Sequence, residues 1–182
     1  MIDNREILDW LLNQGIDINC NTGQDFHLYT NEGPLWDNTC AVLNKAAALG
    51  DVEPFDHLVS RGADPSRSVA LHMATRCEDP AKTVAMITHL IEQYHFDVNN
   101  NDDTCNGLWN KGLGGGLGEG VPLNGALVWD NLAAVEVLLK YGADTCDRHV
   151  LLVAIVAQAR YNSNTTPVIK LCSKLALMLP MA

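Results

Sequence analysis

The chain has little positive charge. Of its 182 residues, 12 are lysine or arginine and 22 are aspartate or glutamate, which gives a formal net charge of −10. Proteins that bind nucleic acids or anionic membranes rely on basic side chains that meet phosphate groups. The composition therefore argues against both of these partners.

Long apolar runs and secretion signals are also missing. No stretch is apolar enough, for long enough, to span a bilayer, and the first six residues lack the basic and apolar regions of a signal peptide. The six cysteines are scattered, which is typical of reduced thiols in a chain that is not secreted. We expect an intracellular protein, most simply a cytoplasmic one.

Motifs for metals, nucleotides and covalent catalysis are absent as well. No two cysteines form a CxxC pair, and no histidine has such a pair nearby, so no zinc site is expected. The glycine-rich run from Gly112 to Gly120 fits no GxGxxG register and is interpreted as a hinge. Neither GxSxG nor HExxH occurs. We expect no cofactor and no metal, and we assign no catalytic residue.

What the sequence does contain is a pattern that repeats along the chain. Gly62-Ala63-Asp64 returns as Gly142-Ala143-Asp144, so the period is 142 − 62 = 80. At the same offset, without a gap, further residues recur in identical pairs: Ile7 and Ile87, Asp17 and Asp97, Asn19 and Asn99, Leu28 and Leu108, Asn44 and Asn124, Leu71 and Leu151, Ala74 and Ala154. An internal repeat decides the architecture before any local motif does, and it favours a solenoid of similar, stacked units.

Within these units the apolar residues are spaced as in amphipathic helices. Apolar spacing predicts helices over residues 4–14, 41–49, 53–60, 121–128, 133–141, 150–158 and 167–178. Gly62 and Gly142 are expected to end a helix in the left-handed conformation, which glycine adopts without steric penalty. The fold is therefore predicted to be all-α apart from its loops.

Two stretches resemble the ankyrin repeat: residues 43–50 followed by 58–64, and 121–126 followed by 137–144. Residues 69–74 resemble the Thr-Pro-Leu-His-x-Ala motif of that family, with its histidine at His72, and His95 replaces the usual glycine at the end of that unit. The resemblance implies a single domain over residues 1–182, with about four and a half repeats organised as a duplicated pair. It also implies that His72, Asn44 and Asn124 bond to the backbone across repeats.

The connections between units alternate in length. Nine residues separate Gly62 from Leu71, whereas 28 separate Gly15 from Leu43, and the second half repeats both spacings. In the ankyrin family such connections are hairpin fingers, so two long fingers, from Cys20 to Cys40 and from Asn100 to Gly120, should project from one side. Long loops are often functional. The candidate partner-binding residues are the aromatic and apolar ones there: Phe26, His27, Leu28, Tyr29, Trp36, Leu108 and Trp109.

The leading hypothesis is recognition of a protein partner by these fingers and the adjoining concave helical face, since ankyrin proteins mostly act as noncatalytic binding modules. An alternative is that the aromatic residues only pack each finger onto the helices. A second alternative is a small-molecule or enzymatic site between the fingers, using acid–base groups from this set: Asp25, His27, Glu32, Asp37 and Glu119. A third is self-association through the last predicted helix, which is apolar nearly all round and includes Leu175 and Leu179.

Overall fold

The computed structural model describes residues 4–19, 40–100 and 121–145, and within these ranges the regular structure is helical, without strands. The expected all-α class is thereby confirmed. The elements are α1 (Asn4–Asn13), α2 (Ala41–Leu49), α3 (Val52–Ser60), the short 3₁₀ helix η2 (Pro65–Arg67), α4 (Ala70–Ala74), α5 (Pro80–Tyr94), α7 (Pro122–Val128) and α8 (Leu132–Lys140). The two fingers and the helices predicted over 150–158 and 167–178 lie outside the described residues.

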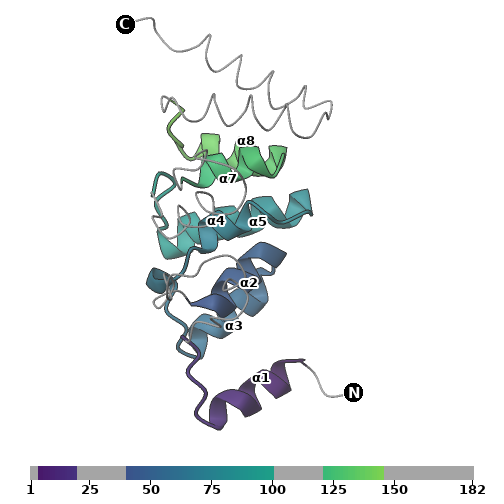
Figure 1. Ribbon diagram of the computed structural model, residues 1–182, viewed down its shortest axis with the longest axis vertical. Helices are drawn as coiled ribbons and strands as arrows, with labels where there is room; N and C mark the ends of the chain where they lie inside the picture. The colour runs from purple at the N-terminus through teal and green to yellow at the C-terminus, as the bar shows by residue number, and fades with distance from the viewer. Residues whose placement is uncertain (1–3, 20–39, 101–120, 146–182) are drawn as a thin grey trace, which may run out of the picture.

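The helices form consecutive pairs, α2 with α3, α4 with α5 and α7 with α8. The first members of the pairs pack in one row, because α4 contacts both α2 and α7. The second members form a parallel row, in which α5 contacts both α3 and α8. Helix α1 lies at one end of this stack, and α7 and α8 lie toward the other (Figure 1).

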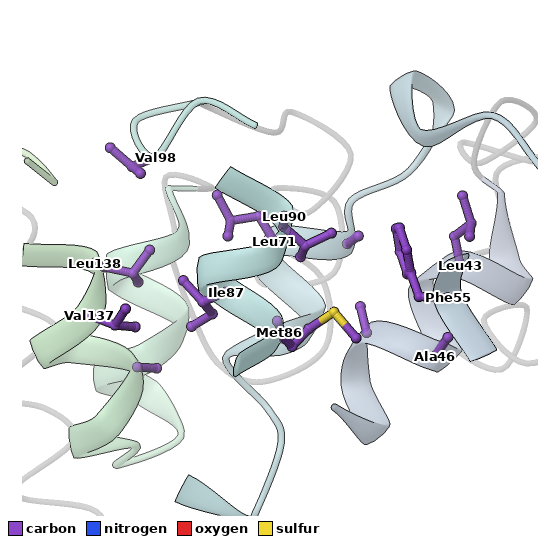
Figure 2. Close-up of a cluster of buried hydrophobic side chains, with 14 of the residues drawn as sticks. Leu43, Ala46, Phe55, Leu71, Met86, Ile87, Leu90, Val98, Val137 and Leu138 are labelled. Carbon is purple, nitrogen blue, oxygen red and sulfur yellow. The ribbon is translucent and has the colours of Figure 1, made fainter. Parts of the chain in front are cut away.

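The core lies between the two rows and runs through successive pairs (Figure 2). Small side chains line the first row, where Ala47, Ala70, Ala74 and Ala126 are fully buried. Alanine lets helices approach closely and has the highest helix propensity, so these short helices can form once packed. Larger side chains fill the remaining space: Leu43, Phe55, Leu71, Met86, Ile87, Leu90, Leu127 and Leu138.

The sequence placed most of these helices within one residue at either end. The exceptions are α4 and α5, whose first and last residues were not predicted from the sequence. Helix α5 is nevertheless the longest described helix. The start of α5 is fixed by Asp79, whose Oδ1 accepts hydrogen bonds from the N–H groups of Ala81 at 2.9 Å and Lys82 at 3.1 Å. Pro80 follows at the first helical position, where its missing N–H costs nothing.

Each unit ends in a residue with left-handed backbone. Gly15, Gly62 and Gly142 have φ of 87°, 100° and 86°, and His95 occupies the corresponding place with φ 58°. The expected glycine conformation at Gly62 and Gly142 is confirmed. A side chain with a Cβ atom is strained in this region, so His95 stores unfavourable backbone energy.

Replacing His95 by glycine should relieve this strain. The side chain is exposed, so little packing is lost. We expect His95→Gly to raise the free energy of unfolding by about 1 kcal/mol, measured by urea denaturation. The matched control is Gly142→His, which should lower it by a similar amount. A destabilised His95→Gly variant would contradict the equivalence of the two positions.

Candidate functional site

The predicted partner-binding residues all lie outside the described residues: Phe26, His27, Leu28, Tyr29, Trp36, Leu108 and Trp109. The same holds for the acid–base groups of the enzymatic alternative, Asp25, Glu32, Asp37 and Glu119. The structure does describe the points where the two long segments, residues 20–39 and 101–120, join the helices. The described parts of the connections between the helical pairs run along one edge of the stack, on the left in Figure 1.

The first long segment begins beside Asn19, whose side chain is bound to the turn after α3. Asn19 Nδ2 donates to the carbonyl oxygen of Gly62 at 2.9 Å, and Asn19 Oδ1 accepts from the N–H of Asp64 at 2.8 Å. One amide group thus satisfies a donor and an acceptor of a turn that is distant in the sequence. The backbone N–H of Asn19 donates to Asp17 Oδ1 at 2.9 Å, which fixes the approach of the chain.

The second long segment begins in the same geometry, one period later. Asn99 Nδ2 donates to the carbonyl oxygen of Gly142 at 3.3 Å, and Asn99 Oδ1 accepts from the N–H of Asp144 at 2.7 Å. Its backbone N–H donates to Asp97 Oδ1 at 2.9 Å. We call these two sets of bonds, centred on Asn19 and Asn99, the asparagine clamps. They give both segments equivalent starting points on the same edge.

The first segment also returns to its starting point. Cys40, which follows it, is fully buried, and its backbone N–H donates to the carbonyl oxygen of Arg67 at 2.8 Å. Its Sγ lies 3.6 Å from the carbonyl oxygen of Ile18, next to the clamp. Burial raises the pKa of the Cys40 thiol, which lowers its reactivity. Cys40 therefore closes the base of the segment as a structural residue.

The turn held by the first clamp is itself rigid. Asp64 Oδ1 accepts hydrogen bonds from Ser66 Oγ at 2.7 Å and from the Ser66 N–H at 2.9 Å. These bonds favour the charged form and lower the pKa of the Asp64 carboxyl. Asp64 and its three counterparts, Asp17, Asp97 and Asp144, give this edge a negative charge close to both starting points.

Two further asparagines connect neighbouring pairs. Asn44 Oδ1 accepts from the N–H of Val69 at 2.8 Å, as the resemblance implied. Asn131 caps α8 through a bond from the Ala134 N–H at 3.1 Å, and its Nδ2 donates to the carbonyl oxygens of Thr75 and Cys77 at 3.0 and 2.9 Å. Asn131 thereby holds the pair α7–α8 against the turn between α4 and α5.

A group of three titratable side chains connects α3 with α5. Asp56 Oδ1 accepts from the hydroxyl of Tyr94 at 2.7 Å and lies 2.7 Å from His89 Nε2. The Tyr94 ring packs edge-on against Phe55 and His89. Burial, and then the bond to Asp56, raises the pKa of Tyr94 to about 12. The group contains no paired nucleophile, and its bonds join two helices.

The part of the chain that the structure describes contains no group of three or more histidine, cysteine or acidic residues that could hold a metal ion. No described helix is both long and apolar enough to cross a membrane. Comparisons with protein-family models, with curated proteins and with solved structures find no significant match. The candidate site is therefore defined by geometry alone: the edge that carries the two asparagine clamps.

Asn19 and Asn99 recur one period apart in the sequence, but the pattern predicted no role for them. The sequence feature that could have indicated their role is a constant spacing: each asparagine precedes the glycine of a Gly-Ala-Asp turn by 43 residues. Asn131 and the group around Asp56 were missed. Their partners come from different units and share no short motif.

The raised pKa of Tyr94 predicts a pH dependence of stability. An unfolded tyrosine ionises near pH ~10, whereas folded Tyr94 stays neutral to about pH 12. Its neutral form therefore stabilises the folded state below pH ~10, and this contribution is lost as the pH rises through the folded pKa.

The stability difference between the wild type and Tyr94→Phe should accordingly be constant below pH ~10 and should fall by on the order of 2 kcal/mol toward pH ~12. Urea denaturation at a series of pH values measures it. A difference that does not change with pH up to ~12 would show that burial and the bond to Asp56 do not disfavour ionised Tyr94 as described.

Proposed function

We propose that this chain is an ankyrin-type repeat protein that recognises a protein partner through its two long segments. Several features support the ankyrin assignment. The helices form stacked pairs in two rows, and each unit ends in a left-handed residue. His72 stands in the motif that resembles the family's Thr-Pro-Leu-His-x-Ala, in the middle of α4.

The observation that carries the functional proposal is the pair of asparagine clamps. Asn19 and Asn99 make the same bonds at corresponding places of the repeat, so residues 20–39 and 101–120 start from equivalent points of one helical stack. Residues 61–69 are enough to connect α3 with α4, so residues 20–39 and 101–120 are longer than a connection between helical pairs requires. Long segments on a rigid scaffold are a common way to build a binding surface.

The composition of these segments fits protein recognition. The proposed anchors are Tyr29 and Trp36 in the first segment and Trp109 in the second, and aromatic side chains often dominate the energy of an interface. Because the clamps fix the start of each segment, less conformational entropy is lost when the segment becomes ordered on binding. The four aspartates on the same edge and the net charge of −10 favour a basic partner and speed its encounter at low salt.

The proposal is tested by affinity capture from the source lysate with three baits. These are the wild type, a finger variant with Tyr29, Trp36 and Trp109 changed to alanine, and a control with Val84 and Trp129 changed to alanine. The two control side chains are exposed and lie in α5 and at the end of α7, so the control removes apolar and aromatic surface elsewhere. Circular dichroism must show the same helical content in all three.

We expect a protein that the wild type and the control retain and the finger variant loses. With that protein purified, calorimetry should show at least about tenfold weaker binding to the finger variant, since each lost aromatic anchor costs about 1 kcal/mol or more. Equal retention by all three baits, or no retained protein, would contradict recognition through the long segments.

A further inference from the structure

Helix α1 exposes apolar side chains at positions that are buried one period later. Ile87 and Leu90 of α5 are fully buried, whereas their counterparts in α1, Ile7 and Trp10, are 45% and 61% exposed. Ile16, just after α1, is 49% exposed. Three of the six large apolar side chains that are exposed in the described residues thus fall within ten positions. We call Ile7, Trp10 and Ile16 the α1 patch.

The difference follows from the neighbours of the two helices. Helix α5 packs against α3, α4 and α8. Helix α1 lies at the end of the stack, and no described helix takes beside it the place that α4 takes beside α5 (Figure 1). The α1 patch is therefore a core face without its covering helix.

The contacts that do hold α1 leave this patch free. Toward α3, the side chain of Asp9 meets His57 and Arg61, each at 3.2 Å, and Arg5 meets Glu53 at 2.7 Å. Leu8 and Leu12 pack partly against the core. Polar bonds and these two leucines fix the orientation of the helix, and Trp10 remains outside.

The charges of the two ends of the chain indicate which segment could bind the α1 patch. Residues 1–19 contain four acidic side chains and one basic one, a net −3, and residues 146–182 contain four basic side chains and one acidic one, a net +3. The last segment is thus basic in a chain whose overall charge is −10. It also combines apolar residues with the basic ones, including Leu175, Leu179, Lys170 and Lys174.

We propose that the α1 patch of one molecule binds the basic, apolar residues 146–182 of a second copy, so that copies associate end to end. Helix α8, which ends five residues before the last described residue, lies at the opposite end of the stack from α1 (Figure 1). The segment that follows it starts far from the patch of its own chain. The two contacting surfaces differ, so the interface is heterologous and can extend beyond a dimer.

Sedimentation velocity of the full chain over a concentration series tests this. The wild type should show a mass that rises with concentration beyond one chain, and the association should weaken in ~0.5 M salt because opposite charges are screened. Trp10→Glu removes the patch, and the double variant Lys170→Glu/Lys174→Glu reverses the charge of the other end. Each variant alone should be monomeric at concentrations where the wild type associates.

Mixing the two variants gives the decisive result. The Trp10→Glu chain keeps a normal last segment and the double variant keeps a normal α1 patch, so an equimolar mixture should form a dimer and nothing larger. Ile7→Glu replaces Trp10→Glu if circular dichroism shows that the latter has lost helix. The proposal is overturned if the wild type stays monomeric, if either variant associates like the wild type, or if the mixture stays monomeric.

Discussion

The asparagine clamps are the constraint on which the arrangement of this protein depends. A side-chain amide offers a donor and an acceptor in fixed geometry, and Asn19 and Asn99 use both on a turn that is distant in the sequence. Each clamp joins the end of one unit to the end of the next. The start of each long segment is consequently set by the stack of helices and not by the segment itself.

The helices contribute a second kind of order. Individually they are too short to be stable in water, and four of them have fewer than ten residues and no side-chain cap. Packing in two rows supplies the stability, with alanines in the first row and larger side chains between the rows. Asn44 and Asn131 add polar bonds between pairs, so the stack resists sliding of one pair along another.

Much of the fold could be predicted from the sequence because it repeats. The constant offset between the two halves located the helices from Ala41 to Leu49 and from Leu132 to Lys140 within a residue, and it marked Gly62 and Gly142 as left-handed turns. The site was less predictable. The role of Asn19 depends on two groups brought near by folding, and Asp56 meets Tyr94 only because α3 and α5 pack together. Trp10 is exposed because no described helix packs over that face of α1. The spacing of apolar residues predicts the helix but not which of its side chains stay exposed.

Hydrogen exchange at the amides of Asp64 and Asp144, followed by nuclear magnetic resonance, tests the central claim most directly. In the wild type both amides should be protected, because Asn19 Oδ1 and Asn99 Oδ1 accept from them. Asn19→Ala should speed exchange at Asp64 by about tenfold and leave Asp144 unchanged, and Asn99→Ala should do the converse. Unprotected amides in the wild type, or equal effects of both variants at both sites, would contradict the account.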